Sequence, residues 1–139
     1  MIRQLAHICF FTNDLNAMHK FYEEKLGLKI KFTLDNPDGK TFGYYFDCGN
    51  STFIEVFDRN MAASQWGGRS EKSVPGNLFQ HLCFEVTGLI EYKSKLEKKG
   101  LTVSEISTGM DNSKQAWIAD PDGNSIELME YTCKSLQIQ

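Results

Sequence analysis

The 139-residue sequence contains the same short pattern twice. HICF begins at His7 and HLCF begins at His81, and each is followed by an amphipathic segment that ends at a glycine. Each half then closes with an apolar segment around a glutamate, FIEVF around Glu55 and SIELM around Glu127. The matched landmarks lie between 72 and 74 residues apart. Nearly constant spacing of this kind indicates two copies of one unit, so the fold must accommodate a duplication.

Each copy has the residue pattern of a βαβββ unit. Alternating apolar residues predict strands, and a 3.6-residue apolar period between Asn-Asp caps and a glycine stop predicts a helix. In the first copy we expect strands at 3–11, 28–34, 41–48 and 51–57, and a helix at 15–25. In the second copy we expect strands at 79–86, 102–106, 114–119 and 124–130, and a helix at 88–99. The predicted fold class is therefore α+β, with two paired βαβββ modules.

The expected organisation is a single domain in which a linker joins two modules. The modules cover about 1–57 and 79–131, and the linker covers 58–78. A connection of that length without its own secondary structure is often functional or mobile in a compact domain. The last residues, 131–139, read as a loosely attached tail.

Composition excludes several classes of function. Hydrophobic residues make up 41% of the chain and charged residues 24%, as in an ordinary globular domain, and the formal net charge is −3. That charge disfavours nucleic-acid or anionic-membrane partners, which select basic surfaces. There is no apolar run long enough for a membrane span and no signal-peptide pattern, so we expect a cytoplasmic protein. The cysteines form no CxxC pair and are expected to be buried, reduced thiols: Cys9, Cys48, Cys83 and Cys133.

Four residues stand out because strand alternation places them opposite apolar neighbours. His7 lies opposite Ile8 and Phe10, and His81 occupies the matching position in the second copy. Glu55 and Glu127 are each flanked by apolar residues that face the other way. If helices cover the apolar faces, both imidazoles and both carboxylates project from the opposite, concave faces of the two copies.

Two readings of these four residues compete. A single His on a strand, or a single Glu near a strand end, is usually a structural or solvated residue. Two His and two Glu in the same order and at the same place in each repeat are harder to explain in that way. Clustered buried carboxylates and imidazoles need compensation, which a divalent cation supplies. Mixed nitrogen and oxygen ligands suit Ni, Zn, Co or Mn, so His7, Glu55, His81 and Glu127 are the expected metal ligands.

The chain resembles the glyoxalase/bleomycin resistance/extradiol dioxygenase superfamily, also called the vicinal oxygen chelate superfamily. The resemblance covers nearly the whole sequence and rests on FYEEKLGL at 21–28, FIE at 53–55, HLCFEV at 81–86 and DPDGNSIEL at 120–128. It implies that paired βαβββ modules form a cup around one divalent metal ion. It also implies a small-molecule carbonyl or thioester substrate and, as is common in the family, a homodimer.

The His/Glu/His/Glu set is most similar to glyoxalase I, the lactoylglutathione lyase group. That resemblance implies conversion of the hemithioacetal of methylglyoxal to a lactoyl thioester, with Glu127 or Glu55 moving the proton. An epimerase of the methylmalonyl-CoA type is an alternative, although such enzymes usually carry Gln where this chain has Glu55. A non-enzymatic binder of small ligands is another.

The resemblance to glyoxalase I is incomplete at the positions that hold glutathione. Glutathione-dependent members typically have Arg four residues after the first His and often have Asn four residues after the first Glu. This chain has Phe11 and Arg59 there. Arg59, Arg69 or Lys72 are candidates to hold another anionic group, or are simply solvated charges. The thiol co-substrate, the choice of metal, and whether one chain or two form the site stay open at this stage.

Overall fold

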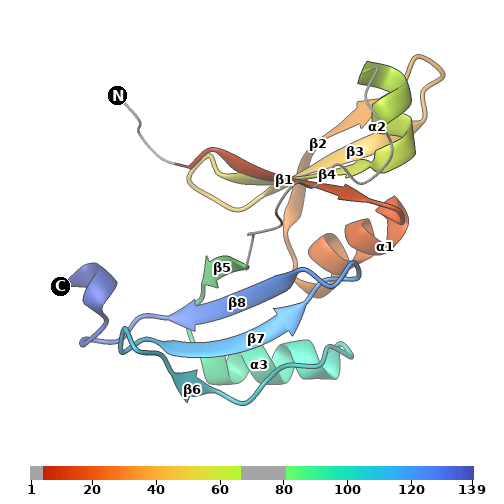
Figure 1. Ribbon diagram of the computed structural model, residues 1–139. Helices are drawn as coiled ribbons and strands as arrows, with labels where there is room; N and C mark the ends of the chain where they lie inside the picture. The colour runs from red at the N-terminus through yellow and green to blue at the C-terminus, as the bar shows by residue number, and fades with distance from the viewer. Residues whose placement is uncertain (1–4, 67–80) are drawn as a thin grey trace. The chain divides into compact units, whose positions relative to one another are not determined.

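The computed structural model describes residues 5–66 and 81–139, and the chain divides into two compact units, residues 1–77 and 78–139. Each unit holds one four-stranded sheet and at least one helix (Figure 1). The prediction of an α+β fold made of two βαβββ modules is confirmed. Among the described residues, no helix is long and apolar enough to cross a membrane.

The sheet of the first unit joins the first and last strands of the module side by side. The strand order is β1-β4-β3-β2, with β1 parallel to β4 and the other pairs antiparallel. The strands are β1 His7–Thr12, β2 Lys29–Asp35, β3 Thr41–Asp47 and β4 Phe53–Asp58. The register places Cys9 opposite Glu55 on one side and Tyr45 opposite Glu55 on the other.

A helix covers one face of this sheet, as the apolar period predicts. It begins as α1 Leu15–His19, with the Asp14 side chain accepting from the Ala17 amide, and continues as the π-helix η1 Lys20–Lys25. Its buried side chains pack on the face that carries Ile54, Val56 and Phe46. The segment ends at Gly27, whose φ of +82° confirms the predicted left-handed stop.

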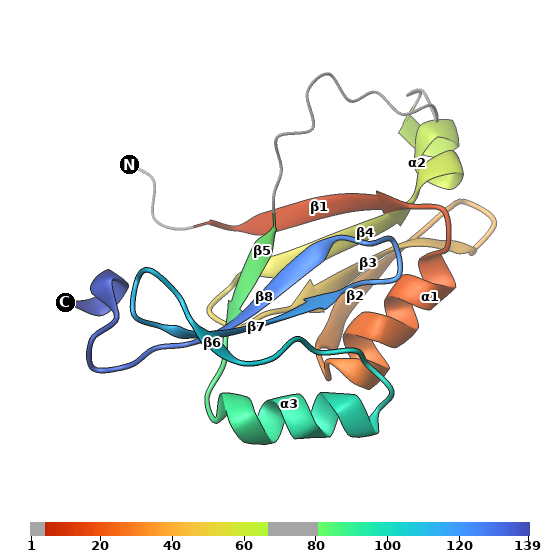
Figure 2. The ribbon, with the colours of Figure 1, turned by 60° about the horizontal axis from the view of Figure 1, so that its bottom comes forward.

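The sheet of the second unit has the corresponding order, β5-β8-β7-β6. Its first and last strands along the chain, β5 and β8, are again parallel neighbours. The strands are β5 Leu82–Glu85, β6 Ser107–Thr108, β7 Lys114–Ala119 and β8 Ser125–Glu130. The helix α3 Leu89–Lys98 packs beside β7 and β8 (Figure 2). The predicted turn before β8 is built by Asp120, whose carboxylate accepts from the Asp122 and Asn124 amides.

The strand predicted at 102–106 is wrong: these residues form no regular strand, and the two-residue strand that pairs with β7, β6, begins only at Ser107. The Ser104 amide donates to the Trp117 carbonyl at 2.9 Å, as in a ladder. The return bond from the Trp117 amide, however, goes to the Ser104 hydroxyl at 2.9 Å rather than to a main-chain carbonyl. Serine side chains compete with the ladder in this way, and the regular strand is interrupted.

The prediction that 58–78 is a linker without structure is wrong for its first part. Residues Arg59–Trp66 form the helix α2, and the Asp58 carboxylate caps it by accepting from the Met61 amide at 2.8 Å. Ala62 is buried against Phe42 and Phe57 at one end of the sheet. The predicted linker residues 67–78, including Arg69 and Lys72, lie outside the described residues.

The prediction of a loose tail is also wrong. The Leu136 amide donates to the Asp111 carbonyl at 2.9 Å, and the fully buried hydroxyls of Ser113 and Ser135 lie 2.8 Å apart. The tail ends in a short 3-10 helix, η2 Leu136–Ile138. Polar groups make these hydrogen bonds, so the sequence contains no periodic apolar pattern that would have predicted that the tail is held in place.

Candidate metal centre

The first unit brings His7 and Glu55 together on the face of its sheet opposite α1. Glu55 is on the central strand β4, and its side chain is only 7% exposed, whereas the His7 side chain is 49% exposed. His7 Nδ1 lies 3.3 Å from Glu55 Oε1. This oxygen is buried and has no hydrogen-bond partner, because the short separation to His7 does not have hydrogen-bond geometry.

The second unit repeats the arrangement with His81 and Glu127. His81 immediately precedes β5, and its Nε2 lies 3.2 Å from Glu127 Oε2. The exposed fractions of the two side chains are 32% and 12%. The other ring nitrogen of His81, Nδ1, is buried without a hydrogen-bond partner. Each unit therefore provides one half-buried imidazole, one mostly buried carboxylate and one unsatisfied polar atom.

The unsatisfied atoms of Glu55 and His81 lower the stability of the folded state. A buried acceptor or donor without a partner destabilises the folded state by roughly 1–3 kcal/mol, and more for a charged group. Native proteins keep few such atoms, and an absent ion is one reason for keeping them. The buried carboxylate oxygen of Glu55 is an atom that a cation would satisfy.

The separations within the pairs also fit ligands of one ion. Two ligand atoms about 2.1 Å from a six-coordinate ion, at right angles to each other, lie about 3.0 Å apart. The His7–Glu55 and His81–Glu127 separations of 3.3 and 3.2 Å are close to this value. Within the described part of the chain, no three His, Cys, Asp or Glu side chains gather closely enough to hold a metal ion. Each unit provides a candidate half-site of two side chains, and metal binding by either pair stays a prediction, as does the joining of both pairs around one ion.

Two thiols sit beside the glutamates, which corrects the expectation of buried cysteines. Cys9 and Cys83 are free and exposed, and they are paired in register with Glu55 and Glu127. Desolvation first, and then the charge and hydrogen bonding of the glutamate, raise the pKa of each thiol to about 12. Cys133 is also exposed and Cys48 is half-buried.

An aromatic residue completes the row on the other side of each glutamate. Tyr45 is in register with Glu55, and its ring meets His7 edge-on with 6.4 Å between centroids. Trp117 is in register with Glu127 and meets His81 edge-on at 4.9 Å. Desolvation and then hydrogen bonding to Glu55 raise the pKa of Tyr45 to about 12. Sequence reasoning missed these aromatics, although Tyr45 and Trp117 are separated by the same 72 residues as the glutamates.

Other predicted residues lie away from this row. Phe11 is on β1 on the same face as His7 and is 54% exposed, while Arg59 is half-buried at the start of α2. His19 stacks on Tyr44 and approaches Glu23 at 2.5 Å, so it belongs to the helix side of the sheet rather than to the half-site. His19 is half-buried.

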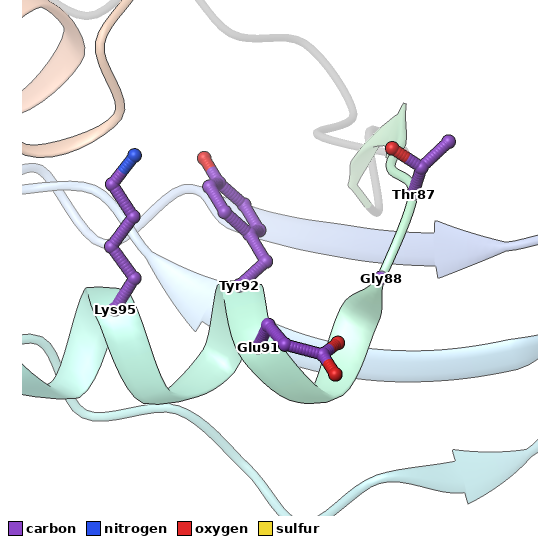
Figure 3. Close-up of a pocket in the computed structure, with 5 residues that line it drawn as sticks. All are labelled: Thr87, Gly88, Glu91, Tyr92 and Lys95. Carbon is purple, nitrogen blue, oxygen red and sulfur yellow. The ribbon is translucent and has the colours of Figure 1, made fainter.

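An open depression of about 450 Å³ lies on the second unit, beside the start of α3 (Figure 3). Its lining residues are Thr87, Gly88, Glu91, Tyr92 and Lys95. Because α3 packs on the sheet face opposite Glu127, this depression is not part of the half-site.

Comparisons with known proteins match the chain to one superfamily. A family model described as the glyoxalase/bleomycin resistance protein/dioxygenase superfamily matches residues 4–128. The chain is 27% identical to lactoylglutathione lyase of Salmonella typhimurium over 129 residues, which is 91% of this chain and 92% of that protein. Lactoylglutathione lyase from Agrobacterium tumefaciens has a TM-score of 0.66 and 25% identity, with 91% and 92% of the two chains covered. A glyoxalase family protein from Enterococcus faecalis shares the fold at 24% identity, with a TM-score of 0.69 over 92% and 98% of the chains. The chain therefore belongs to the glyoxalase/bleomycin resistance protein/dioxygenase superfamily.

Proposed function

We propose that this protein is a metal-dependent lyase or isomerase of the glyoxalase I type. The supporting observation is the duplicated His–Glu pair: each Glu is in register with a Cys, and the N–O separation is nearly the same in both units. Similarity to lactoylglutathione lyases over most of both chains points in the same direction. The proposed substrate is the hemithioacetal that a thiol forms with a 2-oxoaldehyde such as methylglyoxal.

The proposed ligands of one divalent ion are His7, Glu55, His81 and Glu127. The orphaned Oε1 of Glu55, which is also the oxygen that lies 3.3 Å from His7 Nδ1, supports a cation in contact with that pair. When bound, such an ion supplies Lewis-acid stabilisation of the negative charge that develops on a carbonyl oxygen next to the reacting carbon. Ni, Zn, Co and Mn all suit two imidazoles with two carboxylates.

The protein residues would supply the proton transfer. Glu127 and Glu55 are the candidate bases: one carboxylate takes the proton from the carbon that bears the hydroxyl and returns it to the neighbouring carbon. The low exposure of both glutamates, 7% and 12%, would keep water from competing for that proton. The reaction rearranges atoms within the substrate and needs no oxidant or reductant.

Metal content and turnover test this proposal together. We expect about one divalent ion per chain, and we expect its loss in His7→Ala and His81→Ala. Glu55→Gln and Glu127→Gln should each lower kcat by about 100-fold or more, the range of general-base catalysis. Matched controls are His19→Ala, whose imidazole lies on the helix side, and Glu105→Gln, whose carboxylate is 96% exposed. Retention of full activity and metal by both glutamine variants would contradict the proposal.

Two further arms separate the alternatives. Turnover of an acyl-CoA thioester with no turnover of the hemithioacetal would identify an epimerase, and neither activity without bound metal would identify a ligand-binding protein. Mixing the His7→Ala and His81→Ala chains distinguishes a site within one chain from a site shared by two copies. Only a shared site regains metal, because one of the two centres of the mixed dimer then contains four intact ligands.

A further inference from the structure

We propose that a cysteine thiol beside each glutamate is a positioning group, which turns the carboxylate toward the imidazole of its own unit and so toward a bound cation. The thiols are those of Cys9 in the first unit and Cys83 in the second. This role rests on the proposed function, because the carboxylates that the thiols orient are proposed metal ligands.

The pairing of two parallel strands sets the first thiol beside its glutamate. Cys9 on β1 is the register partner of Glu55 on β4, and strand alternation places Cys9 on the same face as His7. Neighbouring strands lie about 4.8 Å apart, so side chains that project from the same face at paired positions reach each other. The Cys9 thiol is accordingly hydrogen-bonded to the Glu55 carboxylate. An ionised carboxylate can only accept, so the thiol is the donor.

The second unit repeats this contact. Cys83 on β5 is the register partner of Glu127 on β8, and its thiol is also hydrogen-bonded to that carboxylate. The two cysteines are separated by 74 residues, the same offset as His7 and His81. The duplicated feature is therefore a set of His, Cys and Glu in each unit, even though the fourth strands of the two sheets differ.

The unsatisfied oxygen of Glu55 shows what a donor on the other oxygen contributes. Oε1 lies 3.3 Å from His7 Nδ1 and has no hydrogen-bond partner, so the bond from Cys9 is assigned to Oε2. A carboxylate held at one oxygen keeps the other in a fixed direction, which is how neighbours of metal ligands orient them. Because a thiol is only a weak donor, it fixes this direction and leaves the carboxylate available to a cation or a proton.

The two units differ in the support that each carboxylate receives from the opposite strand. The Tyr45 hydroxyl is also hydrogen-bonded to Glu55. Trp117, the register partner of Glu127, has no hydroxyl, and its ring meets His81 edge-on. Loss of the thiol should therefore affect Glu127 more than Glu55.

Infrared spectra of the metal-free protein test the thiol–carboxylate bond itself. The S–H stretch lies where the rest of a protein absorbs little, and it moves to lower frequency when the thiol donates to a carboxylate. Cys9→Ala and Cys83→Ala should each remove a lowered band, whereas Cys133→Ala, a control at an exposed cysteine, should remove a band that is not lowered. Glu55→Gln should raise the frequency of the Cys9 band alone. Thiol bands of Cys9 and Cys83 at the frequency of Cys133 would overturn the inference.

Metal affinity tests what the bond does. Competition with a chelator should show Zn²⁺ binding weakened about tenfold in Cys83→Ala and about threefold in Cys9→Ala, near the lower end for groups that hydrogen-bond a metal ligand. Cys83→Ser and Cys9→Ser keep a donor at the same place, so their affinity should return to within about twofold of the unaltered protein. Cys133→Ala should leave the affinity unchanged.

The two measurements separate the positioning role from the function on which it rests. A protein whose alanine variants hold Zn²⁺ as tightly as the unaltered chain contradicts the positioning role alone. Alanine variants that lose Zn²⁺ without rescue by serine would mean that the thiols bind the ion directly, which also overturns it. Lowered thiol bands in an unaltered protein that binds no metal contradict the proposed function, and the positioning role fails with it.

Discussion

The two units carry the same row of side chains but differ in what surrounds it. Across three strands, Cys9, Glu55 and Tyr45 in the first unit correspond to Cys83, Glu127 and Trp117 in the second. The fourth strand differs, since β2 has seven residues and β6 only two. The first three strands of each sheet, β1-β4-β3 and β5-β8-β7, thus preserve the His–Glu pair and its neighbours, while the fourth strand and its side chains have diverged.

This difference separates the constraint that a bound cation would impose on the fold from the constraint that a substrate would impose. A cation bound by both pairs needs equivalent donors from each unit, so a symmetric row serves it. A substrate has no such symmetry, because one end differs from the other. Features that break the symmetry, such as the fourth strand and the helix α2, are therefore the places to look for specificity.

The largest expected difference between the units is the loss of stability when a glycine is replaced by alanine. A Cβ on Gly43 would collide with the Phe57 ring, which is buried against Phe42 and Ala62. Overpacking of this kind costs about 1–3 kcal/mol, so Gly43→Ala should lower the urea midpoint. Gly109→Ala is the matched change in the second unit, and its Cβ meets only the side-chain ends of Asp111 and Gln115. Equal losses for the two variants would contradict the fixed packing of the first unit.

A second prediction tests the symmetry of the thiol–carboxylate pairs in metal-free protein. Because the pKa values of Cys9 and Cys83 are raised to about 12, both thiols stay protonated at pH 8 and become thiolates only as the pH rises toward 12. Both residues reach solvent, which screens part of the effect, so iodoacetamide should modify them about tenfold more slowly than a thiol of ordinary pKa. Mass spectrometry follows each site.

The glutamine variants make the same experiment specific to one unit. Glu55→Gln removes the neighbouring charge from Cys9 alone and should speed its alkylation without changing Cys83, and Glu127→Gln should do the reverse. An equal change at both thiols after either substitution would show that the two rows do not titrate independently.

The sequence predicted the duplicated parts of the fold well and the divergent parts poorly. Apolar alternation and the left-handed stop at Gly27 marked the elements of the first unit within a few residues. The pattern also placed each His on the same sheet face as its Glu. It failed where single polar side chains decide the structure: the Ser104 hydroxyl interrupts a strand, Asp58 starts α2, and Ser135 holds the tail. Such contacts leave no periodic signal.

The aromatic partners of the glutamates were predictable in principle. Tyr45 and Trp117 have the same repeat offset as Glu55 and Glu127, but cross-strand neighbours are known only once the register is fixed. A strand read alone shows which face a side chain occupies and not what it touches on the next strand. The unsatisfied atoms of Glu55 and His81 likewise became visible only in three dimensions.

The smallest expected difference lies at the helix N-termini, where the two units use different caps. In the first unit the local Asp14 carboxylate accepts from the Ala17 amide at 2.9 Å. In the second, Gly88 is the N-cap residue of α3, and the capping side chain is that of Glu130 at the end of β8, which accepts from the Gly88 and Leu89 amides at 2.6 and 3.3 Å. Both carboxylates also oppose the positive end of a helix dipole.

Loss of a capping side chain costs about 0.5–2 kcal/mol, so both Asp14→Ala and Glu130→Ala should destabilise the protein modestly. We expect the larger loss, by about 0.5 kcal/mol within that range, for Glu130→Ala, because its two bonds also tie α3 to a strand 41 residues away in sequence. Chemical unfolding followed by circular dichroism measures both, with Glu105→Gln as an exposed-carboxylate control. A larger loss at Asp14 would mean that α3 is held by its buried Leu89 and Leu96 and that the strand-borne cap adds little.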